Sequence, residues 1–462
     1  MPKKKTALTI EERLQQALVP AEEQPYKVPE NWVWVRLGAV CFFENGYAFK
    51  SDKFSSEKGI PVIRISNIKE NNVDLDDCIK TLEENIDEKF IVHQGDLLIA
   101  MSGATTGKNG VYMSANIAYL NQRVGNIKVK NKELLIEKFR NFYIANMQNE
   151  ILNTAYGGAQ PNISSQKMSV MTFPLPPLSE QQRIVERIEE LFAKLDEAKE
   201  RLQEVADSFA VRKAAILHKA FTGELTKQWR WENGVSDESW EEITWGSFIE
   251  KIEAGKNWNA LGRPPKNGEF GVVKVSAVTW GEFLEDESKT CTEESQWNEE
   301  KRISVGDFLF SRANTIQLVG NCVIVKDVKR KLMLSDKILR FSLSERVYDF
   351  FALWYTRTSS YRKQIESVAS GNQDGMRNIS QNNMKMIIFP LPTLPEQHEI
   401  VRLIDDLLAR ERAAQQAAEQ ALASIDLMKK SILARAFRGE LGTNKASEAS
   451  ALELLKQVLA EN

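Results

Sequence analysis

Two long stretches of the chain place hydrophobic residues at alternating steps of four and three, the spacing of a coiled-coil heptad. One polar residue interrupts each pattern, Arg212 in the first stretch and Glu411 in the second. The other faces carry charges of both signs, which is typical of solvated helix surfaces. The pattern predicts two helices of about 40 residues, roughly 60 Å long, that pair with each other; the alternative is two core helices of one large domain. The predicted seam between them consists of Ile184, Ile188, Leu191, Leu195, Leu202, Phe209, Ile400, Ile404, Leu407, Ile425 and Ile432.

The two stretches are copies of one another. The first begins with Phe173-Pro-Leu-Pro-Pro-Leu-Ser-Glu-Gln181, and 216 positions later the chain reads Phe389-Pro-Leu-Pro-Thr-Leu-Pro-Glu-Gln397. The separation is the same at the helix ends, where Leu217-His-Lys-Ala-Phe-Thr-Gly-Glu-Leu225 matches Leu433-Ala-Arg-Ala-Phe-Arg-Gly-Glu-Leu441. A constant period over about fifty residues indicates an internal duplication. Gly223 and Gly439 are placed to end the two helices.

The shorter patterns before each long helix also follow the same order. Strands are predicted over residues 62–68 and 95–100, and again over 272–278 and 306–310; helices are predicted over about 132–154 and 347–369. The chain is therefore expected to be α+β, with two similar α/β domains separated by two long, paired coiled-coil helices in an internal repeat. The expected boundaries are 1–24 (N-terminal helical arm), 25–172 (first domain), 173–235 (first helical region), 236–388 (second domain), 389–445 (second helical region) and 446–462 (C-terminal helix).

Composition narrows the class of protein. A chain of 462 residues with 42% hydrophobic and 27% charged residues is expected to hold two or three globular domains. It has no apolar run of about 18 residues that could span a membrane, and Met1-Pro-Lys-Lys-Lys5 lacks the apolar segment of a secretion signal. Four widely spaced cysteines are typical of reduced thiols in the cytoplasm. With a net charge of −3, any phosphate contacts must come from local patches or from a partner.

Little in the chain indicates catalysis. The loop Gly103-Ala-Thr-Thr-Gly-Lys-Asn109 resembles a nucleotide-binding loop but has one residue too few between its glycines, and Asn109 stands where Ser or Thr would hold magnesium. An NTPase using this loop remains an alternative, which predicts that Lys108→Ala abolishes nucleotide binding. The three histidines have no cysteine or carboxylate at ligand spacing, so no metal is expected. We expect no catalysis by the chain alone.

The loops that differ between the copies carry residues that can read DNA bases. Asn and Gln pair with adenine, Arg and Lys with guanine, and Thr methyl groups contact thymine. Asn162 has a second interpretation as a helix N-cap, as does Asn378, and Trp258 and Trp280 are either core or stacking residues. The candidate DNA-binding residues are Lys50, Lys53, Arg64, Asn67, Thr105, Thr106, Lys108, Asn109, Asn121, Gln122, Arg123, Gln160, Asn162, Lys256, Asn257, Asn259, Arg263, Lys274, Trp280, Arg312, Asn314, Gln317, Asn372, Gln373 and Arg377.

The duplicated Phe-Pro-Leu-Pro-x-Leu-x-Glu-Gln segment, the heptad helix and the Ala-Phe-x-Gly-Glu-Leu end resemble the specificity subunits of type I restriction-modification systems over nearly the whole chain. Val28-Pro-Glu-Asn-Trp-Val-Trp-Val-Arg-Leu-Gly38 is also similar to that family. The resemblance implies two target-recognition domains held apart by an antiparallel pair of coiled-coil helices, in an internal pseudo-twofold repeat. Each domain would read one half of a split, asymmetric site in double-stranded DNA, and the helices would set the gap. The resemblance does not identify the base-reading residues, because the loops of this family vary too much.

The resemblance also implies partners. Two modification subunits would dock on the helical regions and methylate adenine with S-adenosylmethionine, and restriction subunits would add ATP- and magnesium-dependent translocation and cleavage. No cofactor is expected on this chain itself. The rival hypothesis is a coiled-coil scaffold whose two globular ends bind protein, which predicts no salt-dependent DNA binding.

Overall fold

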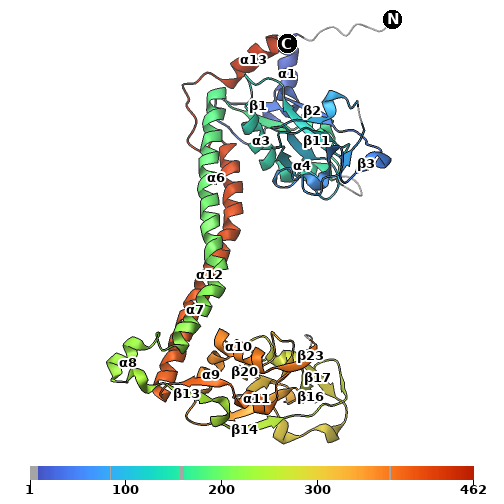
Figure 1. Cartoon of the computed structure of the whole chain (residues 1–462). Helices are drawn as coiled ribbons and strands as arrows, with labels where there is room; N and C mark the ends of the chain where they lie inside the picture. The colour runs from blue at the N-terminus through green and yellow to red at the C-terminus, as the bar shows by residue number, and fades with distance from the viewer. Residues whose placement is uncertain (1–8, 84, 157–160, 374–375, 462) are drawn as a thin grey trace. The chain divides into compact units, whose positions relative to one another are not determined.

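The computed structural model describes residues 9–83, 85–156, 161–373 and 376–461 of the chain. The chain folds as two compact units: unit 1 combines Met1–Arg201 with Ala421–Asn462, and unit 2 is Leu202–Gln420. Each unit therefore holds one globular domain and a piece of each long helix (Figure 1). The duplication in the sequence and the division into units do not coincide, because both helical segments continue from one unit into the other.

In unit 1, the start of α6 (Leu178–Asp207) runs antiparallel to the end of α12 (Leu394–Ala436). Asp196 Oδ1 lies 2.5 Å from Lys429 Nζ. Nearer the start of α6, Arg183 contacts Glu448, which follows α12, through two hydrogen bonds of 2.8 Å. Figure 1 shows these two helix pieces side by side.

In unit 2, α7 (Phe209–Phe221) runs antiparallel to the start of α12. Arg212 Nε lies 2.5 Å from Glu411 Oε2, and Arg230 of the following helix α8 (Lys227–Asn233) lies 2.6 Å from Glu396. The predicted antiparallel helix pair is thus present in both units. Its first member is not one unbroken helix: Ser208 separates α6 from α7, and its hydroxyl donates to the Val205 carbonyl (3.1 Å), a side-chain bond that competes with helix geometry.

The first domain contains two five-stranded sheets and a two-stranded pair. In the sheet orders β2-β11-β8-β9-β5 and β3-β6-β4-β10-β7, most neighbours are antiparallel. The strands are β1 Val33–Arg36, β2 Cys41–Asn45, β3 Phe54–Ser55, β4 Ile60–Ile63, β5 Asn71–Asn72, β6 Lys80–Thr81, β7 Ile91–Val92, β8 Leu97–Ala100, β9 Asn109–Val111, β10 Ala118–Leu120, β11 Val124–Val129 and β12 Thr172–Leu175. The helices are α2 Leu37–Val40, α3 Glu137–Asn146, α4 Gln148–Ala155 and α5 Ser165–Ser169.

The second domain repeats this plan with a four-stranded sheet of order β14-β22-β18-β20, which corresponds to β2-β11-β8-β9. Two further sheets have the orders β15-β17-β16-β21 and β19-β24-β23. The strands are β13 Glu241–Thr244, β14 Ile249–Ala254, β15 Ala260–Leu261, β16 Phe270–Val273, β17 Ser288–Cys291, β18 Phe308–Ser311, β19 Ala313–Asn314, β20 Cys322–Ile324, β21 Lys331–Met333, β22 Ile338–Leu343, β23 Ser370–Gln373, β24 Met376–Asn378 and β25 Ile388–Leu391. The helices are α9 Asp349–Tyr355, α10 Ser359–Val368 and α11 Gln381–Lys385.

The repeated Glu-Gln pair joins each domain to its long helix. Gln181 Nε2 donates to the Leu134 and Pro176 carbonyls (2.9 and 3.0 Å), and its Oε1 accepts from Ile136 N (2.9 Å). Gln397 repeats the arrangement, donating to the Arg346 and Pro392 carbonyls (2.9 and 3.0 Å). Both glutamines are fully buried. In each copy the buried glutamine amide forms hydrogen bonds with backbone groups of the domain and so holds the long helix and the domain together. This role explains why the dipeptide occurs in both copies.

Several predicted elements are shorter than expected. The helix predicted over 132–154 is two helices that meet at Met147, and the one over 347–369 is divided where the Thr358 hydroxyl caps α10. The strands predicted over 62–68 and 272–278 end at Ile63 and Val273, and a 3-10 turn follows each. These apolar runs continue into the turns because the turns are buried too, so hydrophobicity alone does not mark the strand ends.

The terminal helices pack against each other in unit 1. Helix α1 (Ile10–Ala17) begins at a Thr9–Glu12 capping box, and Arg13 donates to the Leu459 carbonyl (3.3 Å) of α13 (Ala451–Glu461). Among the described residues, none of the helices has the length and apolar character that a membrane crossing requires. All four cysteines are free and buried, and burial raises the thiol pKa of Cys41 and Cys322 to about 12, so they stay protonated and unreactive.

Candidate nucleic-acid interface

Backbone hydrogen bonds bring several loops of the first domain to one place. The turn after β10 is the centre of this set: Asn121 N donates to Ile63 O (3.1 Å) and Gln122 N to Tyr47 O (2.9 Å). Arg123 O in turn accepts from Met101 N (3.0 Å). Segments far apart in the sequence, near residues 47, 63, 101 and 122, therefore converge, and they include much of the predicted DNA-binding set.

In the second domain the same backbone hydrogen bonds connect the loops, but different residues form them. Arg312 N donates to Lys337 O (3.0 Å), as Met101 N does to Arg123 O, and Ile379 N donates to Arg312 O (2.9 Å), as Ile163 N does to Met101 O (2.9 Å). Lys337 therefore occupies the place of Arg123. Lys337 was missing from the predicted set, because the loops have different lengths and the match is visible only through these bonds.

A glycine permits this close packing in each domain. A Cβ atom on Gly46 would lie 2.1 Å from the Asn121 carbonyl oxygen, and one on Gly255 would lie 1.7 Å from the Leu334 carbonyl oxygen. Both distances are far inside van der Waals contact, so only glycine fits where these two segments cross.

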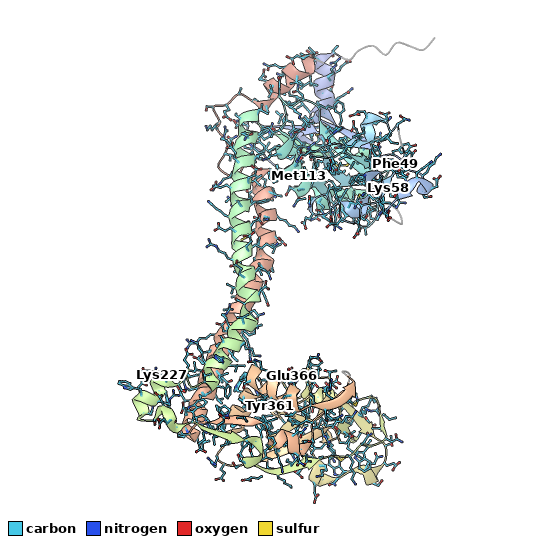
Figure 2. All side chains as sticks on the ribbon, in the orientation of Figure 1. Phe49, Lys58, Met113, Lys227, Tyr361 and Glu366 are labelled. Carbon is cyan, nitrogen blue, oxygen red and sulfur yellow. The ribbon has the colours of Figure 1, made fainter. Side chains whose placement is uncertain are left out.

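An aromatic cluster supports the loop that presents Lys50. The Phe49 ring stacks on Tyr119 with 5.7 Å between centroids and meets Tyr47 edge-on at 4.9 Å. Figure 2 shows Phe49 and Lys58 on the side of the first domain away from α6, whereas Met113 lies next to the helices. The exposed ammonium group of Lys50 therefore lies on a loop that is held by packed aromatic side chains.

The predicted DNA-binding residues fall into three classes of exposure. The exposed ones are Lys50, Lys53, Gln122, Arg123, Asn162, Lys256, Asn257, Asn259, Trp280 and Gln317. The half-buried ones are Arg64, Thr105, Lys108, Asn121, Arg263, Lys274, Arg312, Asn314 and Arg377. Gln160 lies outside the described residues, as do the side chains of Asn372 and Gln373.

Three predicted residues are buried and serve the fold instead. Thr106 is 2% exposed and its hydroxyl donates to the Gly103 carbonyl (2.7 Å). Asn109 is 4% exposed and donates to the Gly107 carbonyl (3.1 Å). Asn67 is 5% exposed and its Oδ1 accepts from Arg64 N (3.0 Å). Each side chain closes a turn within the first domain and would have to break that hydrogen bond to reach DNA.

Three others are already engaged within the second domain. Arg263 makes two bonds of 2.7 Å to Glu269, and this pairing lowers the Glu269 pKa to about 2. Lys274 lies 3.7 Å from a Glu287 oxygen, and Asn314 Nδ2 donates to Thr279 Oγ1 (3.2 Å). Any contact of these side chains with DNA would have to compete with the existing partner.

The interpretation of Asn162 and Asn378 as N-caps is wrong. The residue that caps α5 is Ser164, whose hydroxyl accepts from Lys167 N (3.2 Å), and Ser380 caps α11 by accepting from Asn383 N (3.1 Å). Asn162 instead bridges Ser102, and Asn378 pairs with Ala313 in β24. Both asparagines are exposed at equivalent positions of the frame.

The predicted seam residues divide by position along the helices. Ile184 and Ile188 belong to the core of the first domain, and Ile400 and Ile404 to the core of the second. Ile425 is also buried, whereas the remaining ones are half-buried: Leu191, Leu195, Leu202, Phe209, Leu407 and Ile432. The start of each long helix therefore packs into the core of the domain that precedes it. Within the described residues, no group of three His, Cys, Asp or Glu side chains is placed to hold a metal ion.

Comparison with known proteins identifies relatives along nearly the whole chain. The EcoKI specificity subunit of Escherichia coli K12 is 26% identical over 460 residues, covering 94% of this chain and 96% of its own. The EcoBI specificity subunit of Escherichia coli is 27% identical over 462 residues, covering 94% and 93%. The crystal structure of the HsdS subunit from Thermoanaerobacter tengcongensis has the same fold, with a TM-score of 0.61 at 19% identity, covering 91% of this chain and all of that one.

Both copies of the internal repeat also match a single family model. The model described as "Type I restriction modification DNA specificity domain" matches residues 29–207 and again 237–421. Each match begins near a domain's first strand and ends within the long helix that follows it. The chain therefore belongs to the family of type I restriction-modification DNA specificity subunits.

Proposed function

We propose that each domain of this chain reads one half of a bipartite, asymmetric DNA site. The observation that supports this most directly is the shared frame with unlike side chains. Arg123 and Lys337 occupy equivalent places, as do Met101 and Arg312. Two similar scaffolds that present different hydrogen-bonding groups recognise different base sequences.

The helix pair would set the gap between the two half-sites. α12 has 43 residues, about 65 Å at about 1.5 Å per residue, and half-sites one turn apart lie roughly 34 Å from each other. Its ends belong to the hydrophobic cores of the two domains, so a change in helix length would be transmitted to both. The same helical regions would dock two modification subunits.

The chemistry would reside in partner subunits. S-adenosylmethionine would be bound by the modification subunits, and ATP and magnesium by the restriction subunits, with this chain supplying the DNA sequence specificity and no catalytic group. The complex would work in the cytoplasm, where the four free, buried cysteines stay reduced.

A domain swap tests the proposal. Residues 25–172 are replaced by the first domain of another specificity subunit, and methylated adenines are mapped in DNA from cells that express the chimera with its methyltransferase. The expected result is that one half of the methylated site changes while the other half and the gap persist. A change in both halves, or in neither, would contradict the proposal, and absence of salt-dependent DNA binding by the complex would favour a protein-binding scaffold.

A further inference from the structure

Each unit contains a cleft at the same position of the repeat. The cleft of unit 1 has a volume of about 620 Å³ and lies between β9, α3 and the helix pair; the cleft of unit 2 has about 600 Å³ and lies between β20, α9 and the helix pair. The lining residues correspond: Phe142 and Ala145 match Trp354 and Arg357, both 212 positions later. We call them the unit 1 cleft and the unit 2 cleft.

The two clefts differ in charge at the helix pair. In the unit 1 cleft, Lys429 forms an ion pair of 2.5 Å with Asp196 and lies 5.1 Å above the Phe192 ring. The equivalent of Lys429, 216 positions earlier, is Lys213, and the equivalent of Asp196, 216 positions later, is Arg412. Where unit 1 has the acid Asp196 as the partner of Lys429, unit 2 therefore has a second cation, Arg412, at the equivalent position.

The cations of the unit 2 cleft are not paired with acids. No carboxylate oxygen of a described residue lies within 4.0 Å of the side-chain nitrogens of Lys213, Arg357 or Arg412. Arg357 donates to neutral groups, the Cys322 carbonyl (2.5 Å) and the Gly281 carbonyl (3.2 Å). Burial, and then the charges of Arg357 and Arg412, lower the pKa of Lys213, so its ammonium group is destabilised until an anion arrives.

The acidic residues that line the unit 2 cleft do not offset these charges. Glu282 and Asp327 are exposed. Asp405 is also exposed, and it accepts a hydrogen bond from Trp354 Nε1 (3.2 Å). Lys213 and Arg357 are half-buried and Arg412 is exposed, so the charge in the half-buried part of the cleft, where a counter-ion gains most, is that of Lys213 and Arg357.

The unit 2 cleft is continuous with the DNA-reading loops of the second domain. Thr279 accepts hydrogen bonds from Asn314 (3.2 Å) and Asn321 (2.8 Å). The next residue, Trp280, lines the cleft and is 66% exposed, and Gly281 accepts from Arg357. The segment from Thr279 to Gly281 therefore forms hydrogen bonds with both Asn314 and Arg357.

We propose that the unit 2 cleft binds a backbone phosphate of the DNA beside the half-site read by the second domain, with Lys213, Arg357 and Arg412 as its cationic ligands. The inference rests on the proposed function, since the phosphate belongs to the DNA that the domain reads. The unit 1 cleft does not bind a phosphate in this way, because Asp196 already neutralises Lys429.

The test replaces one cation by the residue found in the other copy. Arg412→Asp in the full chain, assembled with its modification subunits, gives Lys213 the acidic partner that Lys429 has. The slope of log affinity for duplex DNA against log salt concentration should become shallower by about 1 for each phosphate that is no longer neutralised. Lys213→Gln should show the same change. The matched control is Arg410→Asp, with the same change of charge two residues away, where Arg410 pairs with Asp406 at 2.8 Å.

The melting temperature shows that the variants fold. Arg412→Asp should melt no lower than the unaltered protein, because it removes a repulsion. Equal salt slopes in Arg412→Asp, Arg410→Asp and the unaltered complex would overturn the inference while leaving the proposed function intact. Failure of the unaltered complex to bind DNA would overturn both.

Two other outcomes would assign the cleft to another ligand and overturn the inference. One is an unchanged salt slope together with weaker capture of the modification subunit by Arg412→Asp, which would indicate an acidic surface of that protein. The other is an unchanged slope together with a melting temperature that inorganic phosphate raises only when Arg412 is present, which would indicate a free anion.

Discussion

Arg212 and Glu411, the two polar residues that interrupt the heptad patterns, form an ion pair with each other, with 2.5 Å between Nε and Oε2. Their side chains are 32% and 25% exposed, so neither charge is fully hydrated. A single polar pair in an otherwise apolar seam specifies register more than it adds stability.

The first prediction concerns this pair. Glu411→Leu should lower the free energy of unfolding by about 1 kcal/mol, because Arg212 loses its partner while still half-buried. Arg212→Leu combined with Glu411→Leu should recover most of that loss. Urea unfolding of the two single variants and the double variant completes the cycle. Additive losses would show that the two residues do not interact.

The second prediction uses the buried glutamates that the duplication placed 216 positions apart. Glu396 is fully buried and accepts from Arg230 (2.6 Å), Thr226 (2.6 Å) and Trp240 (3.1 Å). Glu396→Gln should cost about 3 kcal/mol of unfolding free energy, because the Arg230 guanidinium, itself 7% exposed, loses its buried counter-charge. Urea unfolding measures the loss.

Glu180 supplies the matched control. It is fully buried as well, but it accepts from neutral donors, Trp32 (2.7 Å) and Asn444 (2.7 Å). Glu180→Gln should therefore cost about 1 kcal/mol, since only hydrogen bonds to a charged acceptor are weakened. Equal costs at the two positions would show that the Arg230 charge is not what Glu396 stabilises.

The long helices and the repeat could be predicted from sequence because each rests on many residues. The heptad spacing extends over several turns, and the period of 216 positions is repeated at Phe389 and at Leu433. The pairing of the helices followed from the need of an apolar seam for a partner, and their antiparallel direction followed from the resemblance to the specificity subunits. The heptad pattern did not show that Ile184 and Ile400 pack into domain cores. Periodicity identifies the buried face of a helix but not the residues that cover it.

The candidate interface was harder to predict because the loops that would form it are far apart in sequence. Residue type selected Arg123, which is exposed, but also Asn109 and Thr106, which are buried in turns. A polar side chain that can form a hydrogen bond with a base can equally form one with a backbone carbonyl, and the fold determines which of the two lies within reach. Lys337 was not among the predicted residues, because its equivalence to Arg123 is visible only in the backbone hydrogen bonds.

The third prediction tests that equivalence. Arg123→Ala should relax the sequence preference in one half of the site, and Lys337→Ala in the other half, each by about 1–3 kcal/mol of discrimination at the base pair that the side chain reads. Methylated sites mapped from cells that express each variant give the measurement. Thr106→Ser, which keeps the buried hydroxyl, is the control and should leave both halves unchanged. Relaxation of the same half by both variants would contradict the assignment of one domain to each half.

The fourth prediction concerns acid stability. Hydrogen bonds from Arg263, and then from Lys266 N, lower the pKa of Glu269 from its usual 4.5 to about 2. Because the folded-state pKa lies below the unfolded one, the pair stabilises the second domain above about pH 4.5, and this contribution is lost as the pH falls toward 2. The melting temperature of Glu269→Gln should therefore lie below that of the unaltered chain at neutral pH and converge with it in acid. A difference that stays constant between these limits would count against the pairing.

The fifth prediction tests the helix pair as the determinant of the gap. One heptad inserted after Arg201 and another after Gln420, where the chain passes between units, should lengthen both helices by about 10 Å and widen the gap by about three base pairs. A whole heptad is used because it keeps the apolar seam on the same face. Both half-sites should stay as they were, since neither domain is altered, and mapping of methylated adenines measures the gap and the halves together. The control lengthens α6 alone: the paired helices then no longer match in length, so the melting temperature should fall and site-specific methylation should disappear. If the doubly lengthened chain methylates the original site with its original gap, the helices do not set the spacing.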